Sequence, residues 1–496
     1  MLFSSMIFLW VFLPGVLIMN YAVNLIPAMN EEKRIRLKNR LLLLASLFFY
    51  AWGGIYYLLI MISSILINFT AGYVIHEKCR SKKAEKTTLV IAIVLNIAIL
   101  FFFKYFNMLV IMLEALLASN HSLHTVIVNM LTMKGTGTLG IKEIVLPIGI
   151  SFFTFQSMSY VCDVYLKKAP LQKNLLDFAL YVSLFPQLIA GPIVKYSDIA
   201  DALKNRKESA SMFYEGQRRF CYGLGKKVLL ANTFAETADT IFALEVSRIG
   251  TPLAWLGIVS YTLQIYYDFS GYSDMAIGIG KMLGFSFREN FNYPYTSLSI
   301  QEFWRRWHIS LSAWFKEYVY IPLGGNRKGK RRTYLNLFVV FLLTGLWHGA
   351  NFTFLFWGIY YGIFLIIERC FLGEWLKKNP IKPLNWIYTM LLVMIGWVYF
   401  RSDNIIAANA YIGQMFGGYS SNYMVLSLLS VKLLMALVIG ILFSGFVQRP
   451  LQNKYHAIEK SMAVRLMDLG FQMIILCTSI LVLVSGTYNP FLYFQF

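Results

Sequence analysis

Long apolar stretches alternate with short basic clusters along the whole chain. Several of the apolar stretches reach or exceed the ~20 residues that a helix needs to cross a membrane. The basic clusters between them read EEKRIRLKNR at 31–40, HEKCRSKKAEK at 76–86, KNRK at 204–207 and NRKGKRR at 326–332. The pattern predicts an all-α polytopic membrane protein with one integral-membrane domain over residues 1–496.

The basic clusters also predict the orientation of the chain, because an excess of Lys and Arg in short loops marks the cytoplasmic side. Segment 2–27 has no basic n-region and no small-residue cleavage site, so we expect a retained first helix rather than a signal peptide. Stretches 41–75 and 334–371 each lie between two cytoplasmic loops. They are predicted to be hairpins, with turns at WGG (52–54) and LWHGAN (346–351). This tracing places both termini outside the cell.

Other stretches extend the prediction. Further spans are expected at about 88–116, 252–283, 386–400, 426–447 and 470–487, and an amphipathic aromatic-basic stretch at 299–320. The sequence FPQLIAGPIVKY (185–196) contains two prolines and predicts a broken or re-entrant element. Non-helical backbone at membrane depth persists only where it is buried in protein or lines a cavity.

Composition agrees with this class and excludes others. Only 14% of residues are charged and 57% are hydrophobic, whereas soluble domains carry about 25% charged residues. The net charge of +20 is explained by the cytoplasmic loops, and no basic module indicates a nucleic-acid partner. Five scattered cysteines without a C-x-x-C pair predict neither a disulfide framework nor a metal site.

Ionisable groups inside the apolar stretches are candidates for chemistry, because such groups are costly at membrane depth. His348 lies at the predicted turn of the second hairpin, and His308 lies in the aromatic-basic stretch. His348 is either a functional group or ties the turn through a hydrogen bond; His308 is either functional or part of an interfacial belt. Asp268 and Asp274, in a glycine-rich apolar helix, must face a polar cavity or pair with another group. On these residues alone, a transporter, a channel and an intramembrane enzyme all remain possible.

Two motif stretches then resemble a known family. These are EFWRRWHISLSAWFKEYVYIPLGGNRKG (302–329) and LLTGLWHGANFTFLFWGIYYG (342–362), which together form a predicted catalytic region over 302–362. They are similar to the membrane-bound O-acyltransferase family, in particular its alginate O-acetyltransferase membrane-subunit branch. Segments 189–203, 218–232, 267–295 and 488–496 resemble the same branch, so the resemblance covers nearly the whole chain.

The resemblance implies a ring of tilted helices with re-entrant elements around a central tunnel. It implies a general-base role for His348, and for His308 either a chemical role or a positioning role. The acyl donor would be a cytoplasmic thioester, acetyl-CoA or an acyl carrier protein, used as a substrate with no bound cofactor. The product would be an O-acetylated extracellular polysaccharide, made with an external transferase partner at a bacterial cell membrane.

Alternatives remain for the substrate and for the class of protein. The acceptor could instead be peptidoglycan or teichoic acid, and the rival class is a transporter of a polysaccharide or lipid-linked sugar. No phosphate-binding loop is present to drive such transport. Further candidate tunnel-lining or positioning residues are Asp268, Ser270, Asp274, Trp304, Arg305, Arg306, Trp307, Trp347 and Asn351. Arg305, Arg306 and the 326–332 loop offer cations for coenzyme A phosphates, or only the usual cytoplasmic charge.

The aromatic segment 488–496, YNPFLYFQF, is the last candidate. The YNP turn is expected to end the final helix near Tyr488, on the outer side. Six further residues reach about 20 Å when extended, enough to fold back towards His348. Tyr493 is therefore a candidate acyl carrier, since a phenol with a pKa near 10 is more acidic than a sugar hydroxyl. The alternative is an aromatic anchor at the membrane interface.

Overall fold

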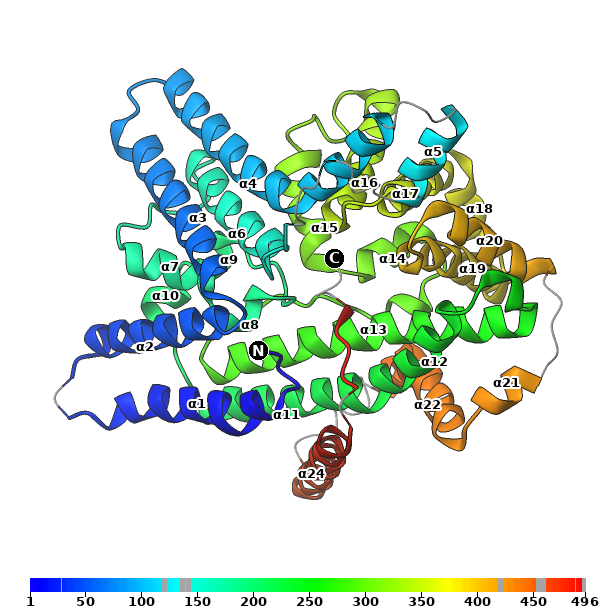
Figure 1. Ribbon diagram of the computed structural model, residues 1–496. Helices are drawn as coiled ribbons and strands as arrows, with labels where there is room; N and C mark the ends of the chain where they lie inside the picture. The colour runs from blue at the N-terminus through cyan, green and yellow to red at the C-terminus, as the bar shows by residue number, and fades with distance from the viewer. Residues whose placement is uncertain are drawn as a thin grey trace.

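The computed structural model describes residues 1–27, 29–117, 123–133, 139, 144–417, 423–451, 461–486 and 488–492, with the backbone alone at 123, 124, 423 and 424. Within them, every regular element is helical (Figure 1). The α-helices are α1 (Leu13–Ala22), α2 (Glu31–Ala51), α3 (Ile55–Tyr73), α4 (Lys82–Leu117), α5 (Leu123–Thr132), α6 (Ile150–Tyr165), α7 (Leu175–Ser183), α8 (Phe185–Leu188), α9 (Tyr196–Ile199), α10 (Ala202–Asn205), α11 (Ala210–Gly225), α12 (Asn232–Phe242), α13 (Thr251–Met282), α14 (Ile300–Arg306), α15 (Ile309–Phe315), α16 (Gly329–His348), α17 (Phe352–Ile367), α18 (Gly373–Lys378), α19 (Lys382–Arg401), α20 (Ile405–Gly417), α21 (Tyr423–Leu428), α22 (Val431–Ile441) and α24 (Met462–Ser485).

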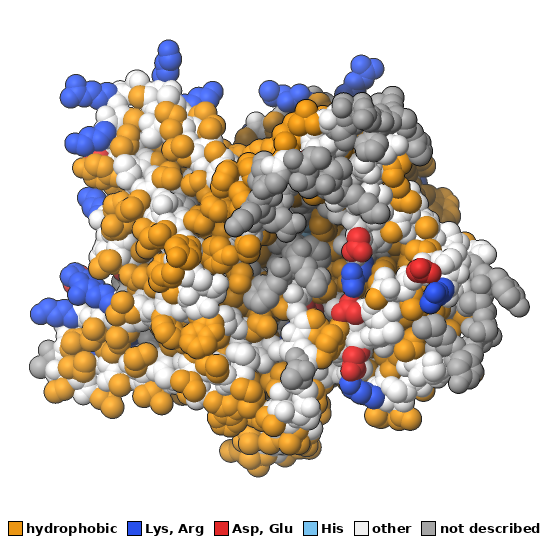
Figure 2. Space-filling view, in the orientation of Figure 1, with side chains coloured by type: hydrophobic (Ala, Val, Ile, Leu, Met, Phe, Trp, Pro, Cys, Tyr) orange, Lys and Arg blue, Asp and Glu red, His pale blue; other side chains and the backbone are white. Residues whose placement is uncertain are grey.

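Several helices are suited to a bilayer. Six in the described part of the chain are long and apolar enough to cross a membrane, and they span Phe8–Leu25, Ile55–Lys78, Lys82–Leu117, Phe352–Lys378, Lys382–Arg401 and Met462–Ser485. Apolar side chains cover much of the face in Figure 2, and most Lys and Arg there lie along its left and upper edges. Figure 1 places the start of α2 and the turn between α3 and α4 at these edges. The predicted all-helical, multi-pass membrane fold is confirmed.

Both predicted hairpins are present. Helices α2 and α3 meet at residues 52–54, where Gly54 has a φ of 145°, a conformation that residues with a side chain rarely adopt. Helices α16 and α17 meet at 349–351. Each turn therefore lies where the sequence predicts it.

The proline-rich segment 185–196 is broken, as predicted. Only the four residues of α8 are helical before an irregular stretch that leads to α9. Every residue from Phe185 to Tyr196 is buried inside the protein. The free backbone groups are thus shielded from lipid, which is the condition for irregular structure at membrane depth.

One element boundary differs from the prediction, and the aromatic-basic stretch 299–320 has an internal break. This stretch forms α14, α15 and a π-helical turn (Lys316–Tyr320), and α14 and α15 are separated at His308, whose φ is 44°. The last helix begins at Met462 rather than near 470, because Asp468 in its first turns is satisfied by the hydroxyl of Tyr222 and the amide of Gln472. A polar side chain lowers the hydropathy at a helix end even where a protein partner satisfies it. The hydropathy pattern therefore misses such ends.

Helix α13 lies across the middle of the molecule and organises the fold (Figure 1). It packs against α11 and α12 on one side and against α19 on the other. Against α11 the backbones nearly touch: a Cβ atom on Gly278 would lie 2.5 Å from the carbonyl oxygen of Gly216, and one on Gly271 would lie 2.8 Å from that of Gly223. Small residues permit this approach, as is common where membrane helices pack.

Gly278→Val is expected to destabilise this interface. A side chain cannot fit against the α11 backbone, and overpacking of this kind costs about 1–3 kcal/mol. The matched control is Gly413→Val in α20, where an added Cβ atom has no neighbour within 4 Å. Thermal unfolding in detergent should show a clear loss for Gly278→Val only; equal midpoints for both variants would contradict the prediction.

Candidate active site

His348 ends helix α16 and lies in a cage of aromatic rings. Its side chain is 6% exposed. The rings of Trp347, Trp357 and Phe400 lie with their centroids 5.0 to 5.1 Å from that of the imidazole. The imidazole makes no hydrogen bond to any described residue, so the structure does not support the interpretation that His348 ties the turn. The cage instead surrounds the imidazole with apolar aromatic surface.

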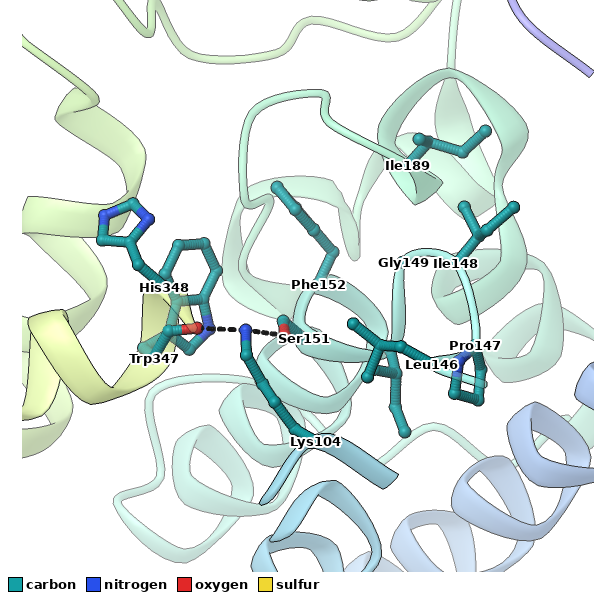
Figure 3. A pocket seen from close by; sticks show the side chains of 11 residues that line it. Lys104, Leu146, Pro147, Ile148, Gly149, Ser151, Phe152, Ile189, Trp347 and His348 are labelled. Carbon is teal, nitrogen blue, oxygen red and sulfur yellow. Dashed lines mark hydrogen bonds between the residues drawn. The ribbon is translucent and has the colours of Figure 1, made fainter. Parts of the chain in front are cut away.

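Other residues hold the turn. Lys104 of α4 donates to the carbonyl oxygen of Trp347 and to Ser151 Oγ, as Figure 3 shows, and Tyr105 donates to the carbonyl oxygen of Leu346. The last carbonyls of a helix have no partner within the helix, so α4 supplies the partners for the end of α16.

Asn351 holds the other side of the turn. Its side chain accepts from the amide of Thr353 at 3.0 Å and thus caps α17, and it donates to the carbonyl oxygen of Asp403 at 2.7 Å. Asn351 therefore shapes the turn, rather than lining one of the described cavities.

His308 is buried, so the interpretation as a member of an interfacial belt is wrong. Its side chain is 1% exposed and contacts the ring of Phe269, with centroids 4.7 Å apart. The ring of Trp347 lies between the two histidines, 6.1 Å from His308 and 5.0 Å from His348. The left-handed backbone at His308 is uncommon for a residue with a side chain and is typical of functional sites.

Asn290 is a site residue that the sequence analysis missed. Its Oδ1 lies 3.0 Å from Nδ1 of His308 and also accepts from Ser310 Oγ at 2.9 Å, while its Nδ2 donates to Ser273 Oγ at 3.0 Å. This orientation of the amide makes Nδ1 of His308 the protonated nitrogen and leaves Nε2 as an acceptor. Nε2 has no partner among the described residues. The only sequence signal was an asparagine in the family-like segment 267–295.

Several cavities surround the two histidines. His348 lines one of about 40 Å³ together with Lys104 and Ser151. It lines another of about 10 Å³ together with Ile265, Asp268, Phe269, Trp307, Trp357, Trp397, Phe400 and Leu492. The predicted residues Asp268, Trp307 and Trp347 are thereby brought to His348, while a continuous tunnel stays a prediction.

The C-terminal segment enters this site. Phe491 and Leu492 are buried, at 5% and 4% exposed, and Figure 1 shows the red end of the ribbon running from α24 to the middle of the molecule. Asp268 accepts from the amide of Leu492 at 3.0 Å and pairs with Lys227 at 2.6 Å, and Lys227 donates to the carbonyl oxygen of Pro490. Asp268 therefore has a partner, as predicted, and the structure identifies that partner as the cation Lys227. Tyr493 lies outside the described residues.

Asp274 also pairs as expected. Its carboxylate forms ion pairs with Arg219 at 2.9 Å and with Lys226 at 2.7 Å. With Ser270 and Asn290 it lines a pocket of about 840 Å³ between α11, α13 and α24. Asn290 thus connects this polar pocket with His308.

A separate pocket of about 290 Å³ contains Trp304 and Arg305. Lys316 and Arg369 also line it, so three cations meet there. Arg306 does not line it but pairs with Glu302 at 2.5 Å. Of the basic loop 326–332, only Asn326 lines this pocket.

The site of this helical membrane protein thus holds two buried histidines, one of which lines two small, largely apolar cavities. The chain belongs to the membrane-bound O-acyltransferase family, whose model matches residues 81–409. It is thus an O-acyltransferase, as predicted.

Particular relatives are more specific than the family. The chain is 41% identical to the probable alginate O-acetylase AlgI of Pseudomonas putida, over all of both chains. It is 35% identical to the peptidoglycan O-acetyltransferase of Helicobacter pylori, over 84% of this chain and 80% of that protein. It is 30% identical to the teichoic acid D-alanyltransferase of Bacillus subtilis, over 50% of this chain and 65% of that one.

Asn290→Leu is expected to lower the acyl-transfer kcat by about a hundredfold, the lower end of what a positioned acid–base group contributes. Without the amide, nothing holds the proton of His308 on Nδ1. Ser273→Ala is the control, since it removes the contact of Asn290 Nδ2 and leaves the contacts of Oδ1 with His308 and Ser310 in place. Steady-state kinetics on folded protein would test this, and the role given to Asn290 is wrong if both variants lose activity equally.

Proposed function

We propose that this chain takes an acetyl group from acetyl-CoA on the cytoplasmic side and passes it across a bacterial cell membrane. The group crosses as an ester on Tyr493 and leaves to an external transferase, which O-acetylates an extracellular polysaccharide. Both termini lie outside. One observation carries the proposal: Leu492, the residue before Tyr493, lines the same cavity as His348.

The docked segment supports this role better than that of an interfacial anchor. An anchor would place residues 488–492 at the membrane surface, yet Phe491 is buried against Tyr272, with ring centroids 4.7 Å apart. Consecutive Cα atoms lie only 3.8 Å apart. A phenol on residue 493 is therefore within reach of a cavity that Leu492 already lines.

The chemistry uses the neutral imidazole of His348. It takes the proton of the Tyr493 hydroxyl as the phenol oxygen attacks the thioester carbonyl carbon. The tetrahedral intermediate collapses with loss of the coenzyme A thiolate, which takes the proton back from the imidazolium. The products are the acetyl ester of Tyr493 and coenzyme A with a free thiol.

The pocket at Trp304 suits the acyl donor. Arg305, Lys316 and Arg369 offer three cations for phosphates, and no carboxylate is among its lining residues. The ring of Trp304 packs against that of Trp357, 5.4 Å away, and Trp357 contacts His348. A donor with its phosphates at Arg305 would thus direct its thioester towards the aromatic cage.

The relatives favour a polysaccharide acceptor. Those similar over their whole length are alginate O-acetylases, which supports an alginate-like extracellular polysaccharide over peptidoglycan or teichoic acid. Acyl transfer is also favoured over transport of a polysaccharide or lipid-linked sugar, because the family consists of acyltransferases. Thioester consumption separates these two classes.

Purified protein incubated with labelled acetyl-CoA is expected to carry an acetyl group on Tyr493. Mass spectrometry of the C-terminal peptide would compare the parent with Tyr493→Phe and His348→Ala, and label should disappear in both variants. Tyr488→Phe is the control, because Tyr488 donates to Asp239 at the start of the same segment. If the protein consumes acetyl-CoA but the peptide carries no label, Tyr493 is not the acyl carrier and the segment is only an anchor.

Arg305→Gln is expected to raise the KM for acetyl-CoA by about tenfold, the effect of losing roughly 1.4 kcal/mol of phosphate binding. The KM for acetyl-pantetheine, which lacks the phosphates, should stay unchanged. Arg306→Gln is the matched control, since Arg306 pairs with Glu302 outside the pocket. Equal effects of both variants on both donors would mean that the phosphates bind elsewhere.

A further inference from the structure

Lys104 is an unusual residue for its position. It lies in α4, one of the helices long and apolar enough to span the membrane, and its side chain is 8% exposed. A buried charge in such a helix is costly and is retained where it serves a function. Neither the acyl transfer nor the motif region 302–362 gives it a role so far.

Lys104 also has no counter-ion in the part of the chain that the structure describes. The described part of the chain contains four buried lysines. Three pair with carboxylates: Lys38 with Glu208, Lys195 with Glu317 and Lys227 with Asp268. Lys104 has no carboxylate partner among the described residues. It bonds instead to the carbonyl oxygen of Trp347 and to Ser151 Oγ, which carry no net charge.

The ammonium group has a donor left over. It carries three hydrogens, and the two partners in Figure 3 account for two of them. Lys104 and His348 line the same cavity of about 40 Å³, which has room for a water molecule or a small polar group. The start of α6, at Ile150 and Ser151, lines it too and adds the positive end of a helix.

We propose that Lys104 is a catalytic residue that binds the acyl carbonyl oxygen when this oxygen becomes negative. The inference rests on the acyl transfer proposed above. As the phenol oxygen attacks, the electron pair of the C=O bond moves onto the oxygen, and the third N–H of Lys104 donates to it. The pair returns when the thiolate leaves, and the lysine keeps its protons throughout. The transient oxyanion supplies the counter-ion that the described residues do not.

If Lys104 only held the end of α16, its contacts would be the same, but its replacement would affect activity differently. Tyr105 donates to the carbonyl oxygen of Leu346 and so holds the same end of α16 without a charge. Asn96, also on α4, is buried and bonds to Asn68 at 2.9 and 3.0 Å, away from the cavity. Tyr105→Phe therefore measures the loss of a turn contact, and Asn96→Leu measures damage to the packing of α4.

The experiment compares these variants with Lys104→Gln, Lys104→Met and Lys104→Arg. Lys104→Gln keeps a donor for the turn, Lys104→Met keeps the length, and Lys104→Arg keeps the charge. Loss of one oxyanion donor costs about 10²–10³ in kcat. Lys104→Gln and Lys104→Met should therefore lose at least about a hundredfold in kcat, with KM for the donor changed less than about threefold. Lys104→Arg should recover part of the loss, and Tyr105→Phe and Asn96→Leu should stay within about tenfold of the parent.

A second measurement tests the role of Lys104 without assuming that acetyl-CoA is the acyl donor. The same variants are expressed in cells that lack the parent chain, and acetyl esters on the secreted polysaccharide are counted by their reaction with hydroxylamine. If the purified parent does not consume acetyl-CoA, the proposed donor is wrong, yet the cellular assay still ranks the variants. The role of Lys104 is overturned if Lys104→Gln keeps kcat or ester content near the parent, or if Tyr105→Phe loses as much.

Discussion

The ion pair between Lys227 and Asp268 is the constraint on which the site depends. Both groups are buried, and a buried pair is tolerable only when its remaining hydrogen-bonding positions are filled. The C-terminal segment fills them: the carbonyl oxygen of Pro490 accepts from Lys227, and the amide of Leu492 donates to Asp268. Asp268 lies on helix α13 and Lys227 lies shortly before α12. This one ion pair thus holds both of these elements to the segment 488–492. Phe491 and Leu492 are part of the interior, and Leu492 completes the lining of the cavity beside His348.

The two histidines differ in their surroundings, and this difference separates their roles. His308 is fixed by a network of amide and hydroxyl groups through Asn290, which sets its tautomer. Among the described residues, the ring of His348 contacts aromatic rings and makes no hydrogen bond, while Lys104, Tyr105 and Asn351 hold the backbone around it. A ring held by a hydrogen bond at Nδ1 presents only Nε2, and Asn290 thus fixes which nitrogen of His308 faces a reacting group.

The sequence predicted the elements that depend on local pattern. Hydropathy and loop charge predicted the hairpin turns, the broken segment 185–196 and the long helix α13, because these follow from what lipid and water tolerate. The motif residues His348, Trp307 and Asp268 do meet in space. The pattern failed where tertiary partners decide: the early start of α24 depends on Tyr222, and the break at His308, which the pattern did not indicate, is held by Asn290. The sequence pattern missed Asn290 and Lys104. One is an asparagine in a loop and the other a lysine in an apolar helix, and the partners that give them a role are distant in the sequence.

The size and lining of the cavities give a reason why the proposed acyl carrier is a residue of the chain rather than a sugar. The two cavities at His348 measure about 40 and 10 Å³ and are lined largely by aromatic and apolar side chains. A sugar brought there would lose the water on several hydroxyls, and each unpaired hydroxyl costs at least about 1 kcal/mol. A phenol has one hydroxyl on an apolar ring and loses little by entering. The step that needs a dry site can then occur inside, on Tyr493, and the hydrated polysaccharide can stay outside with its own transferase. The buried approach of residues 490–492 to His348 is what such a division of labour requires.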